Sequence, residues 1–85
     1  MTELESARGQ MNEINGRMLR LFRERMELSA RIAEIKRESG LPVRDEARER
    51  DILENAAAQS GELSPYAVRF FETLMALSRE YQETL

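Results

Sequence analysis

Two cations interrupt the apolar stripe of a long predicted helix, at positions where the pattern calls for buried apolar residues. Hydrophobic residues recur at helical spacing from Ile14 to Ile35, but the slot at position 25 holds Arg25. Lys36 follows eleven residues later, almost three helical turns on and on nearly the same face. Because burying an unpaired cation is costly, both side chains need an anionic partner. The stripe therefore predicts a site that binds an anion.

Further polar residues fall on the inward faces of two helices predicted downstream. Asp45, Arg48 and Glu49 lie on one face of the first of these helices, at spacings i, i+3 and i+4. Ser78 and Gln82, four residues apart, lie on or beside the apolar stripe of the second. Since these faces should be buried, each polar group needs a partner in the folded protein.

The charges of this cluster do not balance. Its cations are Arg25, Lys36 and Arg48, and its carboxylates are Asp45 and Glu49. Internal salt bridges from the first two cations to the two carboxylates are the simplest interpretation of any single pair, but one cation stays unmatched. A small anion whose carboxylates are held by arginine completes the set. We therefore expect a ligand site in which Asp45 and Glu49 hold the cations in place when the ligand is absent.

Arg8 lies too far from this cluster to join it within one chain. It precedes Arg25 by 17 residues, which places it about 25 Å away along a helix axis and about 100° around it. In a dimer of antiparallel or crossing long helices, Arg8 can reach the pocket of the partner chain. The alternative is an arginine that is simply solvated at the surface.

Three helices are expected to position these side chains, at about 3–39, 45–60 and 64–84, in a single all-α domain covering residues 1–85. Gly40 is a typical residue for ending the first helix, and Asp45 suits the start of the second. Gly61 ends the second helix, and Ser64 is predicted to cap the third, with proline following it.

The first helix is too long for a single small domain to cover. About 35 residues of helix extend for about 50 Å, whereas a compact chain of 85 residues has a diameter nearer 30 Å. A partner chain is therefore expected to cover the rest of the apolar stripe. We predict a homodimer in which the long helices pack against each other.

The composition excludes several classes of function. The chain has no His and no Cys, so catalytic triads, disulfides, zinc hydrolysis and thiol redox chemistry are not expected. A formal net charge of -3 argues against nucleic-acid or anionic-membrane partners. No stretch approaches a membrane span, and the acidic, polar start is unlike a secretory signal, so a cytoplasmic protein is expected. An enzyme of this composition would use carboxylate chemistry or would position an anionic substrate by electrostatics, and neither a metal nor a cofactor is expected.

The polar residues singled out above are Arg8, Arg25, Lys36, Asp45, Arg48, Glu49, Ser78 and Gln82. Their spacing is specific in combination, although no single residue or pair is specific by itself. With the apolar residues between them, they resemble the small all-helical chorismate mutases over essentially the whole chain. Asn15 departs from the family pattern, which usually has Asp there, and Gly9 and Gly16 are unusual inside the first helix. These departures bear on stability more than on activity.

The resemblance implies an intertwined homodimer of three-helix chains with two pockets. It implies the rearrangement of chorismate to prephenate, a step toward phenylalanine and tyrosine that needs no nucleophile, general base or cofactor. In this family pattern Arg25 and the partner's Arg8 grip the two carboxylates of the substrate, assisted by Ser78. Lys36 and Gln82 donate to the ether oxygen. A third group of residues holds the substrate hydroxyl and shapes the floor of the pocket. This group consists of Asp45, Arg48 and Glu49.

Two other functions remain open from the sequence. An isochorismate pyruvate-lyase of the same fold also uses a pericyclic step, although the Arg48–Glu49 pair and Gln82 favour the mutase. A non-catalytic helical dimerisation or regulatory module is the second alternative. In such a module the polar residues would pair internally and close the pocket.

Overall fold

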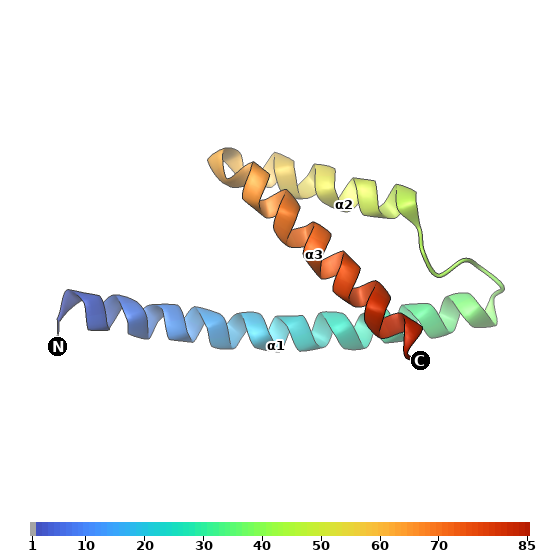
Figure 1. Cartoon of the computed structure of the whole chain (residues 1–85), viewed down its shortest axis with the longest axis horizontal. Helices are drawn as coiled ribbons and strands as arrows, with labels where there is room; N and C mark the ends of the chain where they lie inside the picture. The colour runs from blue at the N-terminus through green and yellow to red at the C-terminus, as the bar shows by residue number, and fades with distance from the viewer. Residues whose placement is uncertain (1) are drawn as a thin grey trace.

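A computed structural model describes residues 2–85, so Met1 of the predicted domain lies outside the described residues. The chain forms three α-helices, with one turn of 3₁₀-helix before the last: α1 (Glu3–Glu38), α2 (Glu46–Gln59), η1 (Gly61–Leu63) and α3 (Ser64–Glu83). α2 and α3 form a hairpin, and α3 crosses back to the C-terminal half of α1 (Figure 1). The expected all-α fold with one long and two shorter helices is confirmed.

The end of α1 is formed by the glycine that the sequence pattern marks. Gly40 adopts a positive φ of 70°, a conformation that glycine tolerates without steric cost. The Leu41 N–H donates to the Lys36 carbonyl at 2.7 Å, and the Gly40 N–H donates to the Arg37 carbonyl at 3.2 Å. This pair of bonds is a Schellman motif. It turns the chain at Gly40 and brings the following connection back over the last turn of α1, where Val43 contacts Lys36.

The start of α2 follows the prediction, whereas the start of α3 does not. The Asp45 carboxylate accepts a hydrogen bond from the Arg48 N–H at 3.0 Å, as an N-cap residue does. Ser64 was expected to cap α3, but it is the first helical residue and Leu63 occupies the cap position. The reason is that η1 runs directly into α3, so Ser64 already has helical backbone angles. Its hydroxyl instead donates to the Ala57 carbonyl at the end of α2.

The single chain buries very little apolar surface. Among residues 2–85 the buried apolar side chains are Ala33, Ala56 and Met75. Larger side chains along α1 stay exposed, including Met18 and Leu21, although the pattern marks them as core residues. The molecule measures 56 × 27 × 15 Å, and the N-terminal end of α1 projects beyond the other helices (Figure 1). One chain therefore leaves most of the α1 stripe uncovered, while the predicted homodimer itself stays a prediction.

No helix within residues 2–85 combines the length and the apolar character that crossing a lipid bilayer requires.

Candidate active site

Ser78 is the centre of a hydrogen-bond network between α3 and α1. It is the buried polar residue of the described chain, with 7% of its surface exposed. Its Oγ accepts a hydrogen bond from Arg25 Nη1 at 2.7 Å and one from Ser29 Oγ at 3.2 Å. The Ser78 hydroxyl in turn points to Met26 Sδ at 3.8 Å. Arg25 is thus held by a neutral oxygen and not by a carboxylate.

Gln82 lies one helical turn after Ser78 and faces the same part of α1. Its Nε2 donates to the Ser29 carbonyl at 2.8 Å. Ser29 therefore contacts both α3 side chains, Ser78 through its hydroxyl and Gln82 through its backbone oxygen. A single turn of α1 thereby sets the positions of two predicted site residues.

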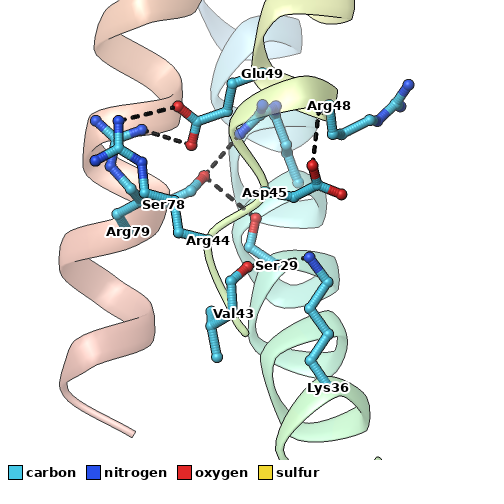
Figure 2. Close-up of polar contacts among 10 residues, drawn as sticks. Ser29, Lys36, Val43, Arg44, Asp45, Arg48, Glu49, Ser78 and Arg79 are labelled. Atoms are coloured by element: carbon cyan, nitrogen blue, oxygen red, sulfur yellow. Dashed lines mark hydrogen bonds and ion pairs between the residues drawn. The ribbon is translucent and has the colours of Figure 1, made fainter. Parts of the chain in front are cut away.

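Lys36 lies in the last turn of α1, where the connection to α2 folds back over it. Its Nζ donates to the Val43 carbonyl at 3.0 Å, and its side chain is half-buried. Figure 2 shows the Lys36 amine on the opposite side of Ser29 from Arg79. As with Arg25, the partner of this cation is a neutral oxygen.

A cleft of about 560 Å³ opens between the helices and contains two of the predicted cations. Arg25 comes from α1, and Arg48 comes from the first turn of α2. The remaining lining residues belong mostly to α2, with one aromatic residue of α3: Asp51, Ile52, Asn55, Ala56, Gln59, Ser60 and Phe71. Arg25 therefore connects this cleft with the network around Ser78.

The two predicted carboxylates do not hold the pocket cations, which corrects the sequence-based expectation. The Glu49 carboxylate pairs with Arg79 Nη1 at 2.7 Å and with Arg44 Nη2 at 3.6 Å. The Asp45 carboxylate is exposed and accepts from the backbone at the start of α2. Glu49 faces α3, so that an arginine of α3 reaches it first. Asp45 is committed to the free N–H groups of its own helix.

The three cations of the predicted cluster, like most other cations among residues 2–85, have no carboxylate partner, because the ion pairs in this range involve only Arg44 and Arg79. Arg25 donates to a hydroxyl and Lys36 donates to a backbone carbonyl. For the guanidinium of Arg48, residues 2–85 supply neither a hydrogen-bond acceptor nor an ion pair. Arg25 and Arg48 line the cleft and are available there to an external anion, whereas Lys36 does not line it. The anion site itself stays a prediction.

Arg8 does not join the other predicted residues within its own chain. It lies on the exposed N-terminal part of α1, away from α2 and α3. Its distance from Arg25 follows from the rise of the continuous helix between them, about 25 Å.

Comparison with known proteins identifies the family of the chain. Residues 7–83 match the chorismate mutase type II family. The chain belongs to that family. Over 54 residues it is also 43% identical to a bifunctional chorismate mutase/prephenate dehydratase of Aquifex aeolicus (strain VF5). That match covers 64% of this chain and 15% of the relative, so the chain spans only a small part of the protein to which it is similar. The resemblance drawn from the polar residues is confirmed.

Two residues of this chorismate mutase family member were not singled out from the sequence. Ser29 follows Arg25 by four residues, and that spacing places both on one face of α1. Arg79 follows Ser78 directly and lies one helical turn after the buried Met75. The sequence alone does not assign either residue to the site, because an isolated serine or arginine in a helix is usually solvated. The assignment requires the rotation of α3 relative to the other helices.

Proposed function

We propose that this chain catalyses the rearrangement of chorismate to prephenate, a step toward phenylalanine and tyrosine. The observation that carries the proposal is the set of three cations, Arg25, Lys36 and Arg48, that have no carboxylate partner among residues 2–85. Chorismate is a dianion, and membership of the chorismate mutase type II family supports it as the substrate. The rearrangement needs no nucleophile and no general base, which agrees with a chain that has no His and no Cys.

In this proposal Arg25 binds one substrate carboxylate, and the partner's Arg8 binds the other. The 2.7 Å hydrogen bond from Arg25 to the buried Ser78 supports the first role, since it fixes the guanidinium before the substrate arrives. A planar guanidinium that is already oriented can form two parallel hydrogen bonds to a carboxylate at little further entropic cost. Ser78 thereby assists the binding through Arg25.

Lys36 and Gln82 are the proposed donors to the ether oxygen, where negative charge grows as the C–O bond breaks. Each currently donates to a backbone carbonyl, Lys36 to Val43 and Gln82 to Ser29. A hydrogen bond to a charged acceptor is roughly twice as strong as one to a neutral carbonyl. The exchange therefore favours the transition state over the free enzyme, which is how a preorganised donor accelerates a reaction.

The ring hydroxyl of the substrate is assigned to the first turn of α2. The Glu49 carboxylate pairs with Arg79 and has lone pairs to offer to a hydroxyl donor. Arg48 lines the cleft beside it, and Asp45 fixes the first turn by capping the helix. Holding both ends of the flexible substrate in its reactive conformation supplies the entropic part of the rate enhancement.

The exposed apolar face of α1 supports the predicted homodimer. A groove of about 660 Å³ lies along it, with Met18, Leu19, Leu21 and Phe22 of α1 facing Phe70 of α3. Large exposed apolar patches of this kind usually mark an interface between proteins. A second copy that fills the groove covers the stripe and can bring its Arg8 to the pocket. The cytoplasmic location stays a prediction from the sequence.

The direct test is an assay of purified protein with chorismate and, separately, with isochorismate. The proposal predicts loss of chorismate absorbance with stoichiometric formation of prephenate, and no release of pyruvate from isochorismate. Arg25→Ala should abolish the reaction while the far-UV circular dichroism stays helical. Protein that consumes neither substrate would contradict the proposal and favour a non-catalytic module.

A further inference from the structure

We infer that Arg79 is a positioning residue that orients the Glu49 carboxylate toward the substrate hydroxyl. The inference rests on the proposed function, because the orientation of Glu49 matters only if this carboxylate binds the substrate hydroxyl. It begins from the shortest ion pair of the described chain, in which Arg79 Nη1 of α3 lies 2.7 Å from Glu49 Oε2 of α2. Figure 2 shows the two side chains meeting across the gap between these helices.

The burial of the two arginines around Glu49 distinguishes their roles. The Glu49 side chain is 21% exposed and the Arg79 side chain is 31% exposed, so water screens this pair only in part. Arg44 approaches the other carboxylate oxygen at 3.6 Å, and its side chain is 56% exposed. A long contact between exposed groups contributes little, whereas a short charge-assisted hydrogen bond constrains geometry strongly. The orientation of Glu49 is therefore determined by α3 and not by the connection before α2.

Two consecutive residues of α3 serve two different helices. Successive helical residues project about 100° apart, so Ser78 faces α1, where it holds Arg25, while Arg79 faces α2, where it holds Glu49. α3 thereby connects the proposed carboxylate-binding group with the proposed hydroxyl-binding group. A rotation of α3 that displaced one contact would displace the other, so both ends of the substrate site keep a constant relative position.

The pairing leaves Glu49 able to accept a further hydrogen bond. A carboxylate has about four lone-pair sites, and Arg79 and Arg44 each approach a different oxygen. Without Arg79 the carboxylate would lose the restraint on its rotamer and would no longer be held toward the substrate hydroxyl.

The test is a double-mutant cycle in chorismate turnover. Arg79→Met should lower kcat/KM about tenfold, which is the effect of losing one charge-assisted hydrogen bond. In a Glu49→Ala background the same substitution should cost less than about twofold, because the side chain through which Arg79 acts is then absent. Arg79→Lys should recover part of the loss. The inference would be overturned if Arg79→Met lowered kcat/KM equally with and without Glu49, or if it did not lower kcat/KM in the otherwise wild-type protein.

Two controls separate this role from a general contribution to stability. Arg44→Met removes the arginine at the other oxygen and should cost less than about threefold, so a loss equal to that of Arg79→Met would overturn the assignment to α3. Arg69→Met, an exposed arginine of the same helix, should leave kcat/KM unchanged. Thermal unfolding of all variants gives a parallel cycle, and absence of coupling between Glu49 and Arg79 there would contradict the pairing itself.

The design also separates the inference from the function on which it rests. Wild-type protein that does not consume chorismate refutes the proposed function, and the unfolding cycle still reports on the pairing. Wild-type protein that turns over chorismate while the two substitutions multiply independently refutes only the positioning role of Arg79.

Discussion

The role of Lys36 can be tested by separating its contribution to stability from its contribution to rate. Lys36→Met keeps most of the aliphatic stem and removes the ammonium group. In the free protein the substitution deletes one hydrogen bond, from Nζ to the Val43 carbonyl at 3.0 Å. A hydrogen bond of this kind contributes about 1 kcal/mol to folding. The midpoint of thermal unfolding should therefore fall by only a few degrees.

The same substitution should reduce the rate far more than the stability. If Lys36 donates to the ether oxygen as charge develops there, its removal costs about 2.7–4 kcal/mol in the transition state, a loss of about 10²–10³-fold in kcat. The effect on the activation free energy should thus be about three times the effect on unfolding. The difference arises because Val43 offers a neutral oxygen and the transition state a negatively charged one.

The assay is the initial rate of chorismate disappearance at saturating substrate, with thermal unfolding measured on the same preparations. Arg31→Met is the matched control, since Arg31 is an exposed cation of the same helix and should change neither quantity appreciably. A kcat for Lys36→Met within about threefold of wild type would refute the assigned role. The role would also be refuted if the increase in the activation free energy were no larger than the decrease in the free energy of unfolding.

Three further predictions concern the other donor, the dimer and the long helix. Gln82→Ala should lower kcat by about 10²–10³-fold in steady-state assays, and a near-normal rate would remove Gln82 from the site. Mixing an inactive Arg8→Ala chain with an inactive Arg25→Ala chain should restore up to about a quarter of the wild-type activity per chain, because half of the chains enter mixed dimers with one intact pocket; no recovery after subunit exchange would contradict a shared site. Gly9→Ala should raise the free energy of unfolding by about 0.5–1 kcal/mol in urea titrations, since a Cβ there meets no atom within 4 Å, and a loss of stability would place that face of α1 against another chain.

The fold was predictable because its signals are local. The helical spacing along α1, the glycine at position 40 and the carboxylate at position 45 each act within one or two turns, and the structure follows them. The cap predicted at Ser64 failed because η1 continues into α3, which depends on how α2 and α3 pack.

The partners of the site residues were predictable only in part. Spacing places Ser78 and Gln82 on one face of α3, and both do contact α1. Spacing does not say how far α3 is rotated relative to α2, and that rotation decides whether Glu49 meets a pocket cation or Arg79. Long-range pairs of this kind are determined by tertiary packing. The homodimer was predicted from the length of α1 and stays a prediction, because the apolar surface that would form it is exposed in the single chain.

The central claim is that Arg25, Lys36 and Arg48 lack a carboxylate partner among residues 2–85 because their partner is a dianionic ligand. Thermal unfolding with a bicyclic diacid that resembles the transition state tests this most directly. At a ligand concentration of about 100 times Kd, binding to the native state adds about 2.7 kcal/mol, which should raise the Tm of the wild type by roughly 10 to 20 °C. Arg25→Ala should lose most of that shift. A wild-type Tm that does not move at saturating diacid would contradict the claim.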